Sequence, residues 1–259
     1  MQDTVSSQAM AKYTHDTVVP FEDSGETKKK QVASMFDQIA FRYDFLNRFL
    51  SGGIDIYWRK RAIRELLELK PHTILDVATG TGDLALTAYK YLKPKKIVGI
   101  DISNGMLELG RKKIEKAGLS NVIELQTGDS EAINLPPSTF DAITVAFGVR
   151  NFEDLEKGLS EMFRVLKPGG KLVVLEFSKP RQQVFGGVYN LYMKLIAPGI
   201  GKWFSKNKDA YKYLHSSVKA FPEGETFLHI LQRSGFTDTT LKRLSLGICT
   251  IYCGKKQST

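Results

Sequence analysis

The sequence has few of the residues that build covalent or metal-dependent frameworks. Only two of its 259 residues are cysteines and four are histidines. Two cysteines are too few for a disulfide scaffold, and the dispersed histidines lack the spacing of metal ligands. We therefore expect no metal site. We interpret Cys249 and Cys253, which an alternating pattern puts on one face of a strand, as structural thiols in a reducing cytoplasm.

Long hydrophobic runs are also absent. The most apolar region, residues 184–204, is interrupted by glycines, a lysine and a proline, whereas a membrane-spanning helix needs roughly 20 apolar residues in a row. The N-terminus has no basic start followed by an apolar core, so secretion is not expected. These features favour a cytoplasmic protein, with peripheral binding to the inner face of the plasma membrane as an open alternative.

Acidic residues are outnumbered by basic ones. The formal net charge is +9 and the pI is about 9.4, which favours an anionic partner but cannot separate nucleic acid, an acidic lipid surface and a metabolite. With 42% hydrophobic and 25% charged residues, the chain is typical of a folded globular protein. Its length is compatible with one elaborated α/β domain.

The chain divides into five segments within that single domain. Residues 1–27 are polar and unpatterned and predict a mobile arm. Residues 28–70 have the periodicity of two helices, and the first carries an apolar stripe on one face, made of Val32, Met35, Phe36, Ile39, Tyr43, Leu46 and Phe49. Residues 71–180 alternate between short apolar runs and helical patterns. Residues 181–225 form an aromatic and lysine-rich insertion, predicted as a helical cap. Residues 226–259 end in C-terminal strands.

The apolar runs predict a doubly wound, mostly parallel sheet. "TILDVA", "KIVGID", "VIELQTGD", "AITVAF" and "KLVVLEF" are short and rich in Val, Ile and Leu. Strands that alternate with helices form parallel sheets covered on both faces. From about Phe236 the pattern changes, because "TLKRLSLG" and "CTIYCGKK" predict two strands with no helix between them.

Ligands of such sheets bind beyond the carboxyl ends of the strands. The first strand ends in "LDVATGTGDLAL", where Asp76 precedes Gly80, Thr81 and Gly82 at the opening of a helix. Glycines there let the backbone turn tightly and approach a ligand. A plain turn without a ligand is the alternative for this loop alone.

The next strand ends strengthen the case for an adenosine-type cofactor. Asp101 follows the glycine loop at about 20 residues, the spacing at which an acid binds ribose hydroxyls. Asp129 and Ser130, after the third strand, could reach an adenine ring, and Ala146 ends the fourth strand beside them. Helix capping is the alternative for Asp101. "GTGDLA" also fits a nicotinamide dehydrogenase, which the several acids and the final pair of strands oppose.

Taken as a set, these features resemble class I S-adenosylmethionine-dependent methyltransferases. That resemblance implies a seven-stranded sheet with a reversed C-terminal strand and S-adenosyl-L-methionine as cofactor. "RVLKPGGKLVVLEFS", Arg164 to Ser178, and "YDFLNRFLSGGIDIYW", Tyr43 to Trp58, are similar to the signatures of the ubiquinone/menaquinone biosynthesis C-methyltransferases. The family implies a polyprenyl quinol substrate. Demethylmenaquinol is the first choice and a methoxy-benzoquinol the second.

Ring methylation needs charge stabilisation and a proton acceptor. The resemblance implies that Arg150 and Asn151, at the end of the fourth strand, are catalytic. Arg150 could stabilise developing phenolate charge or orient a water, or it could clamp the turn. Asn151 could bind substrate or cap the following helix. Tyr43 and Asp44 are candidates to line the substrate pocket, and His215 is a weaker candidate base.

The partners follow from the substrate. A prenyl tail needs an apolar channel, and lysines of the insertion, from Lys202 to Lys212, suit an anionic membrane surface. A solvated lysine face is the alternative. Stacking platforms of aromatics interleaved with arginines would favour nucleic acid, and lysines beside aliphatic residues argue against it. Another small-molecule or RNA methyltransferase, a cofactor-binding scaffold without turnover, and a homodimer stay open.

Overall fold

A computed structural model describes residues 13–179 and 208–258; the side chains of residues 42–47, 49, 50, 208 and 211 lie outside that description. The described residues build a seven-stranded sheet in the order β3-β2-β1-β4-β5-β7-β6. The strands are β1 (Thr73–Val77), β2 (Lys96–Asp101), β3 (Ile123–Thr127), β4 (Phe140–Ala146), β5 (Leu166–Phe177), β6 (Thr237–Leu244) and β7 (Cys249–Lys255). Pairing is parallel from β3 to β5, and β7 runs antiparallel to β5 and β6. The predicted sheet with a reversed C-terminal strand is confirmed.

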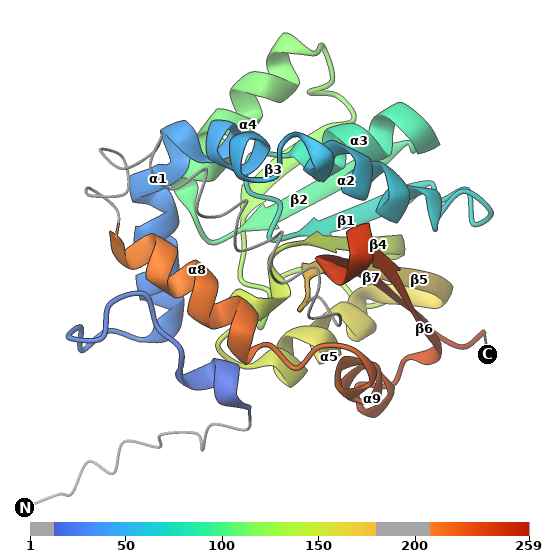
Figure 1. Cartoon of the computed structure of the whole chain (residues 1–259). Helices are drawn as coiled ribbons and strands as arrows, with labels where there is room; N and C mark the ends of the chain where they lie inside the picture. The colour runs from blue at the N-terminus through green and yellow to red at the C-terminus, as the bar shows by residue number, and fades with distance from the viewer. Residues whose placement is uncertain (1–12, 180–207, 259) are drawn as a thin grey trace, which may run out of the picture.

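Helices cover both faces of this sheet (Figure 1). One core packs beneath α2 (Ile54–Arg64), α3 (Asp83–Leu92) and α4 (Asn104–Lys116), and the other beneath α5 (Leu155–Val165) and α9 (Glu225–Arg233). In α5 the buried Leu155, Leu159 and Met162 recur at helical spacing and face the sheet. Cys249 and Cys253 are buried and unpaired in the core under α2, as predicted.

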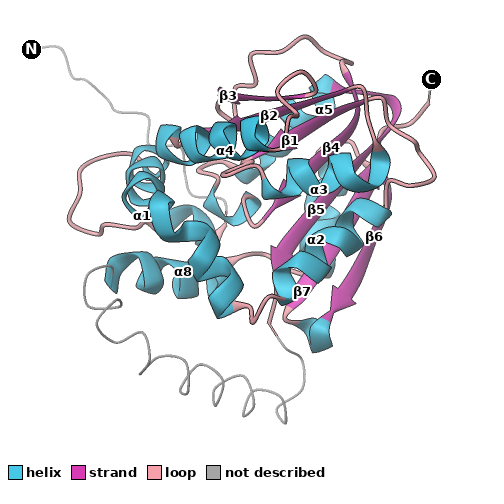
Figure 2. Ribbon diagram, turned by 90° about the horizontal axis from the view of Figure 1, so that it is seen from above, coloured by secondary structure: helices cyan, strands magenta, loops and turns pink. Residues whose placement is uncertain are grey.

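Two further helices, α1 (Lys28–Leu50) and α8 (Lys208–Ala220), lie side by side at one end of the molecule (Figures 1 and 2). Val32 and Met35 of α1 pack with Tyr213 of α8 in a small third apolar cluster. These two α1 residues belong to the stripe that the sequence predicts. Residues 181–207 of the predicted cap insertion lie outside the described residues.

The segment expected to be a mobile arm packs on the body over its described part, residues 13–27. It contains a short 3-10 helix, Thr14–Thr17, and its His15 is fully buried. The backbone carbonyl of His15 accepts a hydrogen bond from Lys28 Nζ at 2.7 Å, and Phe21 N donates to Gln31 Oε1 at 2.9 Å. Buried polar contacts and the aromatic packing of His15 against Phe221 explain the difference from the composition-based expectation.

The fifth strand begins earlier than its apolar run. The predicted run "KLVVLEF" starts at Lys171, whereas β5 already pairs with β4 at Leu166; the next pair is Lys171 with Ala142. The intervening residues form a bulge in which Gly169 has φ +77°.

Among the described residues, no helix combines the length and the apolar character that a membrane span requires.

Candidate functional site

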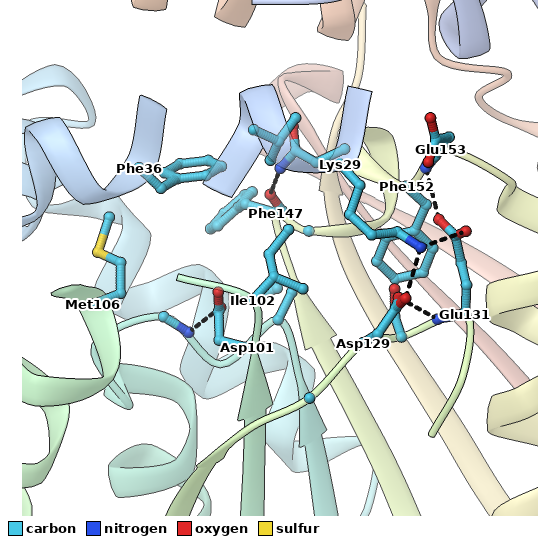
Figure 3. Close-up of a pocket in the computed structure, with 18 residues that line it drawn as sticks. Lys29, Phe36, Asp101, Ile102, Met106, Asp129, Glu131, Phe147, Phe152 and Glu153 are labelled. Atoms are coloured by element: carbon cyan, nitrogen blue, oxygen red, sulfur yellow. Dashed lines mark hydrogen bonds and ion pairs between the residues drawn. The ribbon is translucent and has the colours of Figure 1, made fainter. Parts of the chain in front are cut away.

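A cleft opens where β1, β2 and β4 end, beneath α1 (Figure 3). Parallel strands bring their carboxyl ends to the same edge, so the loops that follow them converge there. Six predicted site residues line this cleft: Gly80, Asp101, Asp129, Ser130, Ala146 and Asn151. Asp76, inside β1, and Thr81, Gly82 and Arg150, in the turns after β1 and β4, do not line it but lie next to it.

Asp76 faces inward at the end of β1. Its carboxylate is buried and accepts hydrogen bonds from Thr79 Oγ1 and Thr144 Oγ1, both at 2.6 Å. It therefore ties the loop after β1 to β4. Burial raises the pKa of Asp76 to about 6, against these two hydrogen bonds, which lower it. Its predicted contact with a cofactor stays a prediction.

The loop after β1 presents backbone to the cleft. Gly80 has φ +56°, and a Cβ added there would meet no atom within 4 Å, so its surface is open to a ligand. Gly82, with φ +77°, begins α3 and faces Leu125 and Ile114 instead. Thr81 is buried and accepts a hydrogen bond from Lys113 Nζ at 2.9 Å. Gly80 thus faces the cleft, whereas Thr81 and Gly82 hold the loop.

Asp101 ends β2 with both oxygens engaged by backbone. Gly80 N donates to its Oδ2 at 2.8 Å, and Ser103 N donates to its Oδ1 at 2.9 Å. Each carboxylate oxygen can accept a second hydrogen bond, so Asp101 can also face a ligand's hydroxyls. The side chain that caps α4 is that of Ser103, which accepts from Met106 N. The capping alternative for Asp101 is therefore wrong.

Asp129 forms an ion pair with a lysine of α1 (Figure 3). Lys29 Nζ lies 2.6 Å from Asp129 Oδ2 and 3.1 Å from Glu131 Oε2. The other oxygen of Asp129 accepts from Glu131 N at 2.9 Å. Burial alone would lower the pKa of Lys29, but its hydrogen bonds to Asp129 and Glu131 outweigh burial and raise it. The ammonium therefore stays charged at this end of the cleft.

Arg150 is buried beside the cleft, in the turn after β4. Its Nη1 donates to Phe147 O at 2.6 Å and to Glu176 Oε1 at 2.7 Å. Glu176, at the end of β5, is fully buried. Burial raises the pKa of Glu176, and the Arg150 charge opposes that rise. Phe147 lines the cleft with φ +59°, so Arg150 clamps a strained turn whose ring faces the site.

Asn151 lines the cleft next to that turn. Its Oδ1 accepts from the hydroxyl of Tyr213 at 3.1 Å, and burial raises the pKa of Tyr213, which keeps that hydroxyl protonated. The side chain that caps α5 belongs to Asp154, which accepts from Lys157 N. Asn151 is therefore not the cap that was one of its two predicted roles.

Of the remaining candidates, only His215 has a described side chain, and it does not line the cleft. Tyr43 and Asp44 belong to the second half of α1, but their side chains lie outside the described ones, and their role in substrate binding stays a prediction. His215 is exposed on α8. In the described parts of the chain, no three histidine, cysteine or acidic side chains gather as a metal site would require.

Several lining residues were not predicted from the sequence. Lys29 and Phe36 come from α1, Ile102 from the loop after β2, Met106 from the first turn of α4, and Phe147 from the turn after β4. Phe36 belongs to the predicted apolar stripe, which indicated a core position rather than a ligand contact. The run of three lysines, residues 28–30, carries no signal that its middle member turns inward.

The burial of Asp76 predicts a stability effect of pH. Its pKa in the fold, about 6, exceeds the ordinary 3.8, so ionisation destabilises the fold, and this contribution to stability falls as pH rises from 3.8 to 6. Asp76→Asn removes the titration. Relative to wild type it should gain about 2 kcal/mol between pH 4 and pH 7, measured by denaturant unfolding at a series of pH values. If the free energies of unfolding of wild type and Asp76→Asn change with pH in parallel, the effect assigned to Asp76 is contradicted.

Comparison with known proteins gives closely similar sequences. A model of the ubiE/COQ5 methyltransferase family matches residues 24–256. A demethylmenaquinone methyltransferase of Bacteroides fragilis is 47% identical over 244 residues, 94% of this chain and 99% of that protein. A ubiquinone/menaquinone biosynthesis C-methyltransferase UbiE of Geobacter sulfurreducens is 46% identical over 230 residues, 88% of this chain and 90% of that one.

Solved structures share the fold at lower identity. A SAM-dependent methyltransferase from Thermotoga maritima superposes with a TM-score of 0.61 at 20% identity, over 87% of this chain and 99% of that one. The cyclase SpnF superposes with a TM-score of 0.62 at 18% identity, over 89% of this chain and 97% of that one. Since proteins named for different activities share this fold, the fold alone does not decide the reaction.

Proposed function

Because the chain belongs to the ubiE/COQ5 methyltransferase family, as its motifs predicted, we propose that it methylates a ring carbon of a polyprenylated quinol with S-adenosylmethionine as donor. The substrate that we favour is demethylmenaquinol. The observation that carries this proposal is the 47% identity to a demethylmenaquinone methyltransferase over nearly the full length of both chains.

The residues of the cleft suit the proposed donor. The Asp101 carboxylate can accept hydrogen bonds from ribose hydroxyls, and Gly80 leaves room for a ligand against the backbone. Phe36 and Met106 provide apolar surface at one end of the cleft, Ile102 lies in its middle, and Asp129 lies at the other end (Figure 3). When bound, S-adenosylmethionine supplies an electrophilic methyl group. The chain's part is to bind the donor, orient it and exclude water.

Two features of the described site bear on the acceptor. Phe147 presents an aromatic ring to the cleft, stacked on Phe177 with ring centres 4.4 Å apart. Asn151 lies beside it with its amide orientation fixed by Tyr213, so it can hydrogen-bond a quinol hydroxyl. Arg150 lies in the same turn after β4 as Phe147 and Asn151. Its charge favours an ionised quinol oxygen if that oxygen approaches the guanidinium.

The proposed reaction is tested by methyl transfer to purified quinols. We expect transfer to demethylmenaquinol with S-adenosylhomocysteine as product, and slower transfer to the methoxy-benzoquinol that is the second candidate. The reverse preference would move the protein to ubiquinone synthesis. Tight S-adenosylmethionine binding without transfer to either quinol would favour the scaffold alternative.

We further propose peripheral association with anionic membranes. The net charge of +9 supports it. In the described part of the insertion, the exposed Lys212 is paired with Glu22 at 2.9 Å, while Lys202 and Lys206 lie outside the described residues. Sedimentation should show more protein on anionic than on neutral liposomes at low salt, and the difference should fade at high salt. Equal recovery in the supernatant with both lipids would contradict association.

A further inference from the structure

Lys29 is the only cation that lines the cleft among the described residues, and neither its sequence context nor the chemistry proposed above explains why it is there. Its ammonium reaches from the first turn of α1 to two carboxylates, 2.6 Å from Asp129 and 3.1 Å from Glu131. Lys29 and Asp129 are both about 30% exposed, whereas Glu131 is 5% exposed. The pair with Asp129 therefore lies at the cleft wall, where a ligand would meet it.

Glu131 is a fixed anchor for this lysine. Its Oε1 accepts hydrogen bonds from Glu153 N at 2.8 Å and from Asp154 N at 3.1 Å, which ties it to the start of α5. Its Oε2 is left for Lys29. Because one partner of Lys29 is buried and fixed, the ammonium is held in place and can in turn hold Asp129.

Asp129 is consequently held on both oxygens, by Lys29 Nζ on Oδ2 and by Glu131 N on Oδ1. Each oxygen keeps a free lone pair, and both can only accept hydrogen bonds while the carboxylate is ionised. A carboxylate fixed in this way discriminates between ligands. A ligand that presents a hydrogen-bond donor to Asp129 is bound, whereas a ligand that presents an acceptor leaves both that acceptor and the carboxylate without a hydrogen bond.

We propose, on the basis of the function proposed above, that Lys29 is a positioning residue that fixes Asp129 as a hydrogen-bond acceptor for the exocyclic amino group of the donor's adenine. The site thereby selects a 6-amino purine over a 6-oxo purine. Lys29 acts through Asp129 and does not touch the base.

The same contacts could instead serve only to hold α1 over the cleft. A second set of bonds argues against this as the main role of Lys29. Asp37 Oδ1 of α1 accepts from Ser103 Oγ at 2.6 Å and from Gly105 N at 2.9 Å. These bonds keep α1 tied to the start of α4 when Lys29 is lost. Loss of the lysine should therefore increase the mobility of the Asp129 side chain more than that of the helix.

The test measures binding of S-adenosylhomocysteine and of its deaminated analogue S-inosylhomocysteine to the full chain by calorimetry. Wild type should prefer the adenosyl compound, and Lys29→Met should reduce that preference about tenfold, mainly by weakening the adenosyl complex. Lys30→Met is the matched control, because Lys30 is the next residue on α1 and is exposed; it should keep the wild-type preference.

A double-mutant cycle tests whether Lys29 acts through Asp129. Asp129→Asn should also reduce the preference, and adding Lys29→Met to it should change the ratio no further. If Lys29→Met weakens the binding of both ligands equally, Lys29 only holds α1 over the cleft, and the inference is overturned. Selective loss of the inosyl ligand would mean that Lys29 contacts the base directly, which also overturns it. Melting temperatures report folding of each variant.

The outcomes separate this inference from the function on which it rests. If wild type binds neither homocysteine compound, the proposed methyl donor is wrong. If wild type binds both equally well, the donor proposal stands and the assignment of Asp129 and Lys29 as the elements that select the base fails.

Discussion

Arg150→Leu is expected to destabilise the fold by about 3–5 kcal/mol, because it leaves the Glu176 carboxylate buried without its charged partner. Glu176 is fully buried, and Arg150 Nη1 lies 2.7 Å from its Oε1. The substitution also removes a hydrogen bond to the carbonyl of Phe147, so the strained turn that lines the cleft should loosen and donor affinity should fall with stability. Denaturant unfolding and calorimetric titration measure the two effects.

These contacts favour the clamp over a purely chemical role for Arg150. A residue that acts only in the transition state would lower the methyl-transfer rate about 10² to 10³-fold and leave donor binding intact. The instability of the Leu variant should also shrink as pH falls, because the buried Glu176 can then take up a proton and lose its charge. A Leu variant with wild-type stability and affinity but slow single-turnover transfer would contradict the clamp.

A double substitution separates the two roles. Arg150→Leu combined with Glu176→Leu replaces a buried ion pair by apolar side chains, which is often neutral for stability. We expect most of the lost stability to return. If donor binding returns and methyl transfer stays slow, Arg150 also acts on the reaction. If transfer returns as well, its role is positional. Arg150→Lys should keep neither the full stability nor the full methyl-transfer rate of wild type, since an ammonium cannot replace a planar guanidinium in this geometry.

Asp101→Ala should weaken S-adenosylmethionine binding by at least about a hundredfold. Two hydrogen bonds to ribose would be lost, each about 1.5–3 kcal/mol when the acceptor is charged, before water compensates. The variant also frees Gly80 N and Ser103 N, which Asp101 now accepts from, so the glycine loop should become less ordered. Calorimetry of the folded variant is the measurement.

Asp141→Ala is the matched control for Asp101→Ala. Asp141 also accepts backbone hydrogen bonds, from His72 N at 2.9 Å and Thr73 N at 2.8 Å, but it lies at the opposite end of the sheet. Its loss should lower stability without changing donor affinity. If Asp101→Ala binds the donor as wild type does, Asp101 is a loop brace and not a ligand residue.

Local patterns in the sequence determined the elements and their order. The apolar runs predicted the strands, because a sheet covered on both faces needs continuous apolar segments. The two final runs predicted a pair of strands without a helix between them, and the family resemblance implied that the last strand is reversed. The strand ends predicted where Gly80, Asp101 and Asp129 would meet, because parallel strands end at a common edge. The motif around Arg164 to Ser178 identified the family, which the comparisons confirmed.

Side-chain direction and long-range pairing were decided only by the tertiary structure. Asp76 and Asp101 look alike in sequence, yet one faces the core and the other the cleft, because the loop after β1 folds Thr79 back onto Asp76. Arg150 meets Glu176 across 26 positions and Lys29 meets Asp129 across 100. No local pattern specifies such pairs, since they depend on which helix packs over which strand end, and that is fixed by burial of the whole core.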